Sequence, residues 1–347
     1  MVDKVFVTGA NGFIAQHIIK QLLEKGYKTV GSVRTIEKGE ILKQLVNNDP
    51  NFEYVIINSL LCEDSFSNAL RAHPETDVFI HTASPVTFFA EDLENEIIIP
   101  AIQGTANMLN SIKKHGHNVK HLVYTSSMAT IVDTTGNGRN SIGKILTEDS
   151  WNKVEYNDGL KNGYMAYCVS KTLSEKLIHS FIKEEKPSYS VAYIQPTYVF
   201  GPQAFKIKNY KQLNSSAEMV NSLLNLKQID KIPPINGDYI DVRDVAKAHI
   251  LAFENHKETN NKRMVLTDSI FTNELLCHII NKNFPQLNIP KGDLVENERQ
   301  IKEDALIGDY HKTRELLNID YIPIEQSIVE MVQQIIDAKE ADEKLKN

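Results

Sequence analysis

Near its start the chain reads Val5-Phe6-Val7-Thr8-Gly9-Ala10-Asn11-Gly12-Phe13-Ile14-Ala15. Its first four residues are apolar or β-branched, and they predict a short buried strand. After the glycines, apolar residues recur at helical spacing from Ile14 to Leu23, which predicts a helix. A strand, a glycine turn and a helix in this order are typical of the first unit of a doubly wound α/β fold that binds a dinucleotide.

The glycines of this turn and the small residue after them suit a nucleotide. Gly9 permits a tight turn, Gly12 lets the backbone approach a pyrophosphate, and Ala15 allows the helix to pack closely on the strand. The helix N-terminus offers N–H groups and the positive end of a dipole. We therefore expect cofactor contacts from Gly9, Asn11, Gly12, Phe13 and Ile14. The alternative is a glycine turn with a purely structural role.

The second expected strand, Thr29–Arg34, indicates which dinucleotide binds. Chains that bind NAD usually carry Asp or Glu about 20 residues past the glycines, where it bonds a ribose hydroxyl. In this sequence the position is Ser32, and Arg34 and Lys38 follow. A carboxylate would repel a 2′-phosphate, whereas a guanidinium and an ammonium attract one. We predict NADP(H) rather than NAD(H), the alternative being that both cations are ordinary surface charges.

The remaining strands and loops continue the pattern of a parallel sheet. Further strands are expected at residues 52–57, 78–81, 121–125, 191–195 and 264–267, with a long helix at 97–113. Open parallel sheets bind ligands at the carboxyl ends of their strands. The loops expected at that edge are Asn58-Ser59, Thr82-Ala83-Ser84 and Ser126-Ser127.

The fold expected from this pattern is a Rossmann doubly wound parallel sheet with a smaller, mainly helical C-terminal lobe. Residues 1–200 and 237–270 are assigned to the NADP-binding part, and residues 201–236 and 271–347 to a substrate-binding lobe. Residues 133–163 are less regular, with a turn signal at 136–138 and a helix-capping pattern at 147–150. We interpret them as an excursion over the site.

The candidate for chemistry is Met165-Ala166-Tyr167-Cys168-Val169-Ser170-Lys171, in a helix expected to run to about Glu184. A helix places Tyr167 and Lys171, four residues apart, on one face. The ammonium is expected to favour tyrosinate and so to lower the tyrosine pKa, which would let Tyr167 exchange a proton with a carbonyl or alcohol oxygen near neutral pH. The alternative for this spacing alone is the edge of an amphipathic helix. Cys168 is expected to serve in packing.

Composition limits the classes of partner and compartment. The 347 residues suffice for one or two domains with a core, and 41% hydrophobic and 24% charged residues are ordinary for a globular protein. A net charge of −7 without a long basic run argues against nucleic-acid or anionic-membrane partners. The three cysteines lie far apart, which fits a reducing compartment. Because the sequence shows no leader pattern and no long apolar run, we expect a cytoplasmic protein, with a nuclear pool left open.

With these elements in hand, the chain resembles the extended short-chain dehydrogenase/reductases, and within them the dihydroflavonol-reductase-like branch. It is most similar to the fungal NADPH-dependent aldehyde and ketone reductases known as methylglyoxal reductases. The resemblance spans nearly the whole chain. It is carried by the stretches at 7–17, 81–85, 125–127, 166–171, 198–203 and 239–249.

The resemblance implies roles for individual residues. Tyr167 would be the proton donor, Lys171 would hold the nicotinamide ribose and lower the tyrosine pKa, and Ser127 would hydrogen-bond the substrate carbonyl oxygen. Arg34 and Lys38 match positions that bind the 2′-phosphate. The positions that match the lining of the nicotinamide half or the phosphates are Pro196, Val199 and Ser216. The substrate would be a small carbonyl compound, and the protein a monomer or a homodimer.

Two departures from the family pattern concern the adenine and the substrate. An Asp followed by an aliphatic residue often bonds the adenine, whereas this chain has Asn58-Ser59. Val86 and Met128 occupy substrate-pocket positions where related enzymes carry larger aromatic groups, although Tyr198 is retained. A less aromatic wall changes substrate choice, so the identity of the substrate is not carried over.

Two other functions and several other sites are weighed against this interpretation. The first alternative is a nucleotide-sugar epimerase or dehydratase. Such enzymes usually hold NAD(H), and Ser32 and Arg34 argue against binding of NAD(H). The second alternative is a non-catalytic NADP-sensing or scaffold protein, which would not need Ser127, Tyr167 and Lys171 together. No metal is expected. We interpret three nearby histidines as solvated side chains rather than metal ligands: His115, His117 and His121. We interpret Asp241 and Asp244 as helix-capping groups rather than a catalytic pair.

Overall fold

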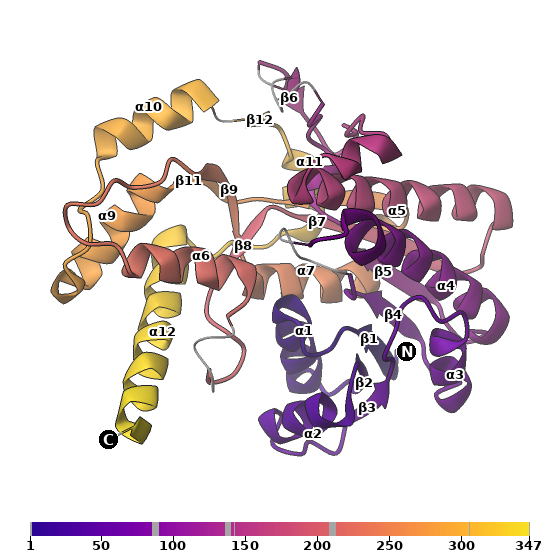
Figure 1. Cartoon of the computed structure of the whole chain (residues 1–347). Helices are drawn as coiled ribbons and strands as arrows, with labels where there is room; N and C mark the ends of the chain where they lie inside the picture. The colour runs from indigo at the N-terminus through magenta and orange to yellow at the C-terminus, as the bar shows by residue number, and fades with distance from the viewer. Residues whose placement is uncertain are drawn as a thin grey trace.

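The computed structural model describes residues 2–84, 90–135, 140–141, 143–207, 213–304 and 306–346 (Figure 1). A seven-stranded sheet has the order β10-β7-β5-β4-β1-β2-β3, and every pairing in it is parallel. Its strands are β1 Lys4–Thr8, β2 Lys28–Val33, β3 Phe52–Ile56, β4 Val78–His81, β5 His121–Thr125, β7 Ser190–Pro196 and β10 Lys262–Leu266. The expected Rossmann-like doubly wound α/β fold is confirmed, and the strand bounds agree with the predicted ones to within two residues.

Helices cover both faces of this sheet because its central strands are apolar on both sides. On β1, Val5 and Val7 pack toward one core cluster and Phe6 toward another. The first cluster lies against α1 (Phe13–Glu24) and α7 (Val242–Glu254). The second lies against α3 (Ser65–Ala72), α4 (Ile99–His115) and α5 (Gly163–Glu185). Helix α2 (Ile36–Leu45) covers β2 and β3 at the sheet edge.

A second, smaller sheet has the order β11-β9-β8 and anchors the other part of the molecule. Its strands are β8 Tyr198–Phe200, β9 Asn236–Asp241 and β11 Ser269–Thr272. The sheet shares a separate apolar core with α6 (Ser215–Leu224), α9 (Asn273–Asn283) and α12 (Ile324–Lys346). In Figure 1 these helices lie on the opposite side of the molecule from α3, α4 and α5. The remaining elements are β6 Ile145–Leu146, α8 His256–Thr259, α10 Leu294–Asp304, β12 Ile307–Gly308 and α11 His311–Leu317.

The segment between β5 and α5 contains only short elements in its described part. A short 3-10 helix, Met128–Thr130, opens it, and β6 pairs in parallel with β12 from late in the chain. The predicted helix cap at residues 147–150 is wrong: the Thr147 amide donates to Ser150 Oγ at 2.9 Å within a turn, and no helix begins there among the described residues. The turn predicted at 136–138 lies outside the described residues.

Within the described part of the chain, none of the helices combines the length and the apolar character that crossing a bilayer would need.

Candidate active site

The carboxyl end of β5 and the first half of α5 bring together two of the predicted catalytic residues. Tyr167 Oη donates to Ser127 Oγ at 3.0 Å, although the residues are 40 positions apart. Ser127 is fixed by its backbone neighbours, since its Oγ also accepts from the Ala129 amide at 3.1 Å. The start of α5 is fixed by Asn162, whose side chain caps the helix by accepting from the Met165 amide at 2.9 Å. Both side chains therefore project from backbone that is held by local hydrogen bonds.

Lys171 lies one turn further along α5 and is buried. Its ammonium donates to the carbonyl oxygen of Thr125, the last residue of β5, at 3.1 Å. Burial lowers the pKa of Lys171 to about 8, while the negative charge of Glu175 acts in the opposite direction. The helix does place Tyr167 and Lys171 in the same region of the site.

The expected lowering of the Tyr167 pKa is wrong. Burial raises the pKa of Tyr167 to about 12, and the hydrogen bond with Ser127 offsets only part of that rise. The physical reason is that the phenol has lost water, whereas the ammonium that was expected to favour tyrosinate is directed to the Thr125 carbonyl. The phenol therefore keeps its proton at neutral pH, which is the form that can give a proton to a carbonyl oxygen.

The glycine turn has the geometry of a phosphate cradle. Gly9 has φ +66°, and a Cβ there would lie 3.1 Å from Ala83 Cα; a Cβ at Gly12 would lie 3.1 Å from the Gly9 carbonyl oxygen. Helix α1 has Gly12 as its N-cap, no side-chain cap and no acidic residue in its first turn. Its first amides are thus free of the side chains that usually satisfy them, which suits a pyrophosphate. The neighbouring Asn11, Phe13 and Ile14 lie at the same turn, as predicted.

The loop after β4 lies directly against the glycine turn. The amides of Thr82 and Ala83 both donate to Thr8 Oγ1 at 3.0 Å. The same oxygen is 3.0 Å from Nδ1 of His81, which is fully buried and has its pKa lowered to about 3 by burial. The strand order reverses between β1 and β4, so this loop and the turn flank the switch point where such sheets bind ligands. Thr82, Ala83 and Ser84 are therefore at the expected edge.

Two exposed cations stand at the end of β2 and the start of α2. Arg34 follows β2 directly, and Lys38 lies in the first turn of α2, which Thr35 caps. Neither cationic group has a hydrogen bond or ion pair within the described part of the chain. Ser32, in the place of an acidic residue, accepts from the Gly9 amide at 3.2 Å. The region thus offers free positive charge without a carboxylate at the ribose position, which fits NADP(H).

The other residues that we predicted to contact the cofactor follow β3, end β7, or lie on β8 and α6. Asn58 and Ser59 are exposed after β3, and Ser59 Oγ accepts from the Leu61 amide at 3.2 Å. Pro196 ends β7, and Val199 lies half-buried on β8. Ser216 lies in the first turn of α6, where its Oγ accepts from Asn214 Nδ2 at 2.7 Å.

The predicted substrate-pocket residues differ in how they are packed. Tyr198 on β8 is 44% exposed, and its ring meets Phe271 edge-on at 5.2 Å. Met128 is buried directly after Ser127, where its sulfur accepts a hydrogen bond from Tyr310 Oη at 3.7 Å. Val86 lies outside the described residues. Tyr310 comes from the far end of the chain, and no motif in the sequence could have indicated it.

The alternative sites resolve as packing and capping groups. Asp241 is the N-cap of α7 and accepts from the Arg243 amide at 2.8 Å, so its predicted capping role is confirmed. Burial raises the pKa of Asp244 to about 6, and its carboxylate accepts from the Ile322 amide at 2.8 Å. The expectation that His121 is solvated is wrong, because it begins the buried strand β5 and its Nδ1 lies 2.8 Å from Ser190 Oγ. In the described ranges, no three His, Cys, Asp or Glu side chains gather as metal ligands would. Cys168 is buried on α5.

The sequence model of the 3-beta hydroxysteroid dehydrogenase/isomerase family matches residues 6–286. This chain belongs to that family. The family is one of oxidoreductases, and the predicted resemblance to the extended short-chain dehydrogenase/reductases is confirmed. The putative NADPH-dependent methylglyoxal reductase GRP2 of Candida albicans is 44% identical over 338 residues, which are 96% of this chain and 98% of the relative. The NADPH-dependent methylglyoxal reductase GRE2 of Saccharomyces cerevisiae is 38% identical over the same shares of the two chains.

Solved structures of the family have the same fold over nearly the whole chain. The yeast methylglyoxal/isovaleraldehyde reductase Gre2 complexed with NADPH matches with a TM-score of 0.92 at 36% identity, covering 97% of this chain and 99% of the other. Gre2 of Candida albicans in complex with NADPH matches with a TM-score of 0.90 at 41% identity and the same coverage. A UDP-glucose 4-epimerase of Thermotoga maritima matches at only 18% identity, so that likeness is one of fold alone.

Proposed function

We propose that this member of the family is an NADPH-dependent reductase that converts a small aldehyde or ketone to its alcohol, with Tyr167 as the proton donor. The observation that carries the proposal is the 3.0 Å contact between Tyr167 Oη and Ser127 Oγ at the carboxyl end of β5. A substrate oxygen bound beside these two hydroxyls can accept a hydrogen bond from each of them. This pair needs no metal and no covalent intermediate to polarise a carbonyl.

The cofactor of the reaction is NADPH. The names of both curated relatives specify NADPH, and both solved relatives are complexes with it. The prediction of NADP(H) as the dinucleotide is confirmed. The uncapped amides of α1 and the glycine turn would hold its pyrophosphate, and Arg34 and Lys38 its 2′-phosphate. When bound, NADPH supplies the hydride that the carbonyl carbon accepts.

The residues of the chain supply position, charge and the proton. Ser127 Oγ hydrogen-bonds the carbonyl oxygen, which draws charge toward that oxygen as the carbon is reduced. Tyr167 Oη gives its proton to the same oxygen, and the high pKa of this phenol keeps the proton available until the oxygen becomes strongly basic. Lys171, whose ammonium is held by the Thr125 carbonyl, would hold the nicotinamide ribose. Proton transfer of this kind contributes a factor of about 100 to 10,000.

In this proposal the two lobes have different roles. The larger, residues 1–200 and 237–270, would bind the dinucleotide, and the smaller, residues 201–236 and 271–347, would close over the substrate. Tyr198 on β8 and Met128 after β5 would line the pocket between them. The names of the relatives specify methylglyoxal and isovaleraldehyde, both small carbonyl compounds, and we extend that substrate class to this chain.

The experiment that tests the function is an assay of NADPH oxidation with purified protein. The panel should contain methylglyoxal, isovaleraldehyde and several ketones, each with NADPH and with NADH, and the alcohol product should be identified. We expect turnover of at least one small carbonyl with a clear preference for NADPH. Absence of turnover across the panel despite tight NADPH binding would favour a sensing protein instead. Protein that purifies with tightly bound NAD would favour an epimerase.

The pH profile of the reaction should show a fall in activity on the alkaline side. Because burial lowers the pKa of Lys171 to about 8, the ammonium is present below that pH and is lost above it. The Tyr167 phenol stays protonated to a much higher pH and so does not cause the fall. We expect kcat/KM for a neutral ketone to be flat from about pH 6 to pH 8 and to fall about tenfold per unit above that. A profile that stays flat to pH 10 would contradict the role of Lys171, and Lys171→Arg, which cannot deprotonate in this range, should abolish the fall.

A further inference from the structure

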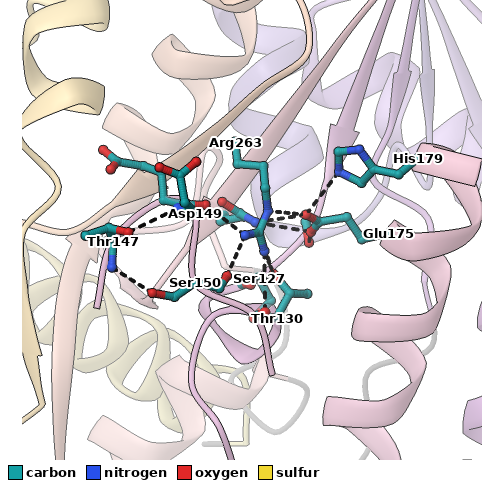
Figure 2. A network of polar contacts seen from close by, with 11 residues as sticks. Ser127, Thr130, Thr147, Asp149, Ser150, Glu175, His179 and Arg263 are labelled. Atoms are coloured by element: carbon teal, nitrogen blue, oxygen red, sulfur yellow. Dashed lines mark hydrogen bonds and ion pairs between the residues drawn. The ribbon is translucent and has the colours of Figure 1, made fainter. Parts of the chain in front are cut away.

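A buried carboxylate lies one helical turn beyond Lys171, and neither the motif nor the mechanism above uses it. Glu175 on α5 is 0% exposed, and Figure 2 shows it facing the guanidinium of Arg263. Arg263 comes from β10 at the edge of the large sheet, 88 residues later in the chain. Buried carboxylates without partners are costly, so the partners of Glu175 indicate what it does.

Both carboxylate oxygens of Glu175 are hydrogen-bonded. Oε1 accepts from Arg263 Nε at 2.6 Å, and Oε2 accepts from the hydroxyl of Ser126. Gln195 Nε2, from β7, donates to both oxygens at 3.1 and 3.2 Å. Burial acts to raise the pKa of Glu175, but contact with His179, the charge of Arg263 and the hydrogen bond from Ser126 hold that pKa below its usual value. The group is therefore an anion at neutral pH.

One of these partners is the residue directly before Ser127. The Ser126 amide donates to the Ile194 carbonyl on β7 at 2.7 Å, so the backbone of Ser126 is fixed by the sheet and its side chain by Glu175. Ser127 follows immediately and contacts Tyr167. A change in the orientation of the Ser126 side chain is therefore transmitted through one peptide unit to the hydroxyl that would bind the substrate oxygen.

Arg263 extends the network to the segment that follows Ser127. Its Nη1 donates to the carbonyl oxygens of Glu148 at 2.8 Å and Ser150 at 2.5 Å, and its Nη2 donates to Thr130 Oγ1 at 3.0 Å (Figure 2). The guanidinium also lies 3.8 Å from the centre of the Trp151 ring. Every one of these contacts is on the chain between Ser127 and α5, so the Glu175–Arg263 pair joins that segment to the catalytic helix.

We propose that Glu175 is a positioning residue for the reductase reaction, which fixes Ser126 beside Ser127 and places a buried negative charge one helical turn from the Lys171 ammonium. This role rests on the function proposed above. It differs from a purely structural ion pair because it makes the state of Lys171 depend on Glu175.

The surroundings of Lys171 explain why one anion matters there. On α5 its neighbours at successive turns are Tyr167 and Glu175. From β4 it faces His81, which is neutral near pH 7 because burial lowers its pKa to about 3. From β5 it meets the uncharged carbonyl of Thr125. Glu175 is the charged side chain that raises the pKa of Lys171 against the effect of burial.

The first test is the pH profile of Glu175→Gln, which keeps the side-chain volume and removes the charge. A nearby opposite charge moves a pKa by about one to three units, so the alkaline fall in kcat/KM should move down by at least about one pH unit. Activity at about pH 8 should then drop about fivefold or more, while the loss at about pH 6 should be much smaller. Glu185→Gln is the matched control, because Glu185 is on the same helix but exposed and paired with Lys113 at 2.6 Å.

The second variant separates positioning from stability. Glu175→Gln alone leaves Arg263 buried without its anion, which lowers the melting temperature, whereas Glu175→Gln combined with Arg263→Gln removes both buried charges and should recover part of that loss. In the double variant Lys171 still lacks its anion, so the alkaline fall should stay at the lower pH. If either folded variant keeps the wild-type profile, Glu175 has only a structural role and the proposal is wrong.

A third variant tests the link to Ser127 with all charges in place. Ser126→Ala removes the hydroxyl that Glu175 holds, so kcat should fall several-fold without a shift in the pH profile and without a change in NADPH binding. Wild-type kcat in Ser126→Ala would contradict this link. These outcomes stay separate from failure of the proposed function, which would instead appear as inactive wild-type protein or as an active Tyr167→Phe variant.

Discussion

Replacing Tyr167 with Phe is expected to lower kcat for carbonyl reduction by a factor of about 100 to 10,000, the usual contribution of general acid catalysis. The substitution removes the phenolic hydroxyl that donates to Ser127 and leaves the aromatic ring in place. NADPH should still bind, because the glycine turn, Arg34 and Lys38 are unchanged. The measurement is single-turnover and steady-state reduction of one ketone, together with NADPH binding followed by fluorescence.

The control for this substitution is Tyr27→Phe. The Tyr27 hydroxyl donates to Glu254 at 2.8 Å beside the first residue of β2, at the end of the sheet away from the site. Its loss should leave kcat unchanged. If Tyr167→Phe kept near-normal turnover, another group would have to supply the proton, and the proposed mechanism would be abandoned.

The double substitution Arg34→Ala and Lys38→Ala is expected to remove most of the preference for NADPH. Hydrogen bonds to charged groups contribute about 1.5–3 kcal/mol each, so each cation should account for roughly a tenfold to hundredfold change in the KM for NADPH. The KM for NADH should change little, because NADH lacks the 2′-phosphate. Kinetics with both cofactors under one set of conditions would measure the ratio.

Lys43→Ala is the matched control for the cofactor experiment, because Lys43 is an exposed cation in the last turn of the same helix. It should leave both KM values unchanged. If the KM values of the double variant for NADPH and NADH rose together, the two cations would stabilise the binding region in general. They would then not recognise the 2′-phosphate.

Local pattern was sufficient to predict the nucleotide end of the molecule. The turn at Gly9 and the strand before it carry their own signals, namely a positive φ that suits glycine and an apolar run that suits a strand buried on both faces. The contact between Tyr167 and Ser127 was also predictable, because both stand at the edge where parallel sheets bind ligands.

Effects that depend on burial and on distant partners were not predictable in the same way. Helical spacing predicts that Tyr167 and Lys171 lie close together. It does not predict the desolvation that raises the pKa of Tyr167, nor the Thr125 carbonyl that accepts a hydrogen bond from Lys171. The position of Glu175, four residues after Lys171, was visible in the sequence and could have been noticed as the next turn of the same face. Its partner Arg263 could not, because only the strand order brings β10 beside β7.

The location of Arg263 on the outermost strand of the large sheet has a consequence for biosynthesis. While the ribosome is still making residues before 263, the emerging polypeptide already contains Ser127, Tyr167 and Lys171, yet Glu175 has no guanidinium to balance it. The ion pair between Glu175 and Arg263 can therefore form only after β10 has been made and has docked beside β7. The buried carboxylate on α5 thus stays without its guanidinium partner until the last parallel strand of the sheet is in place.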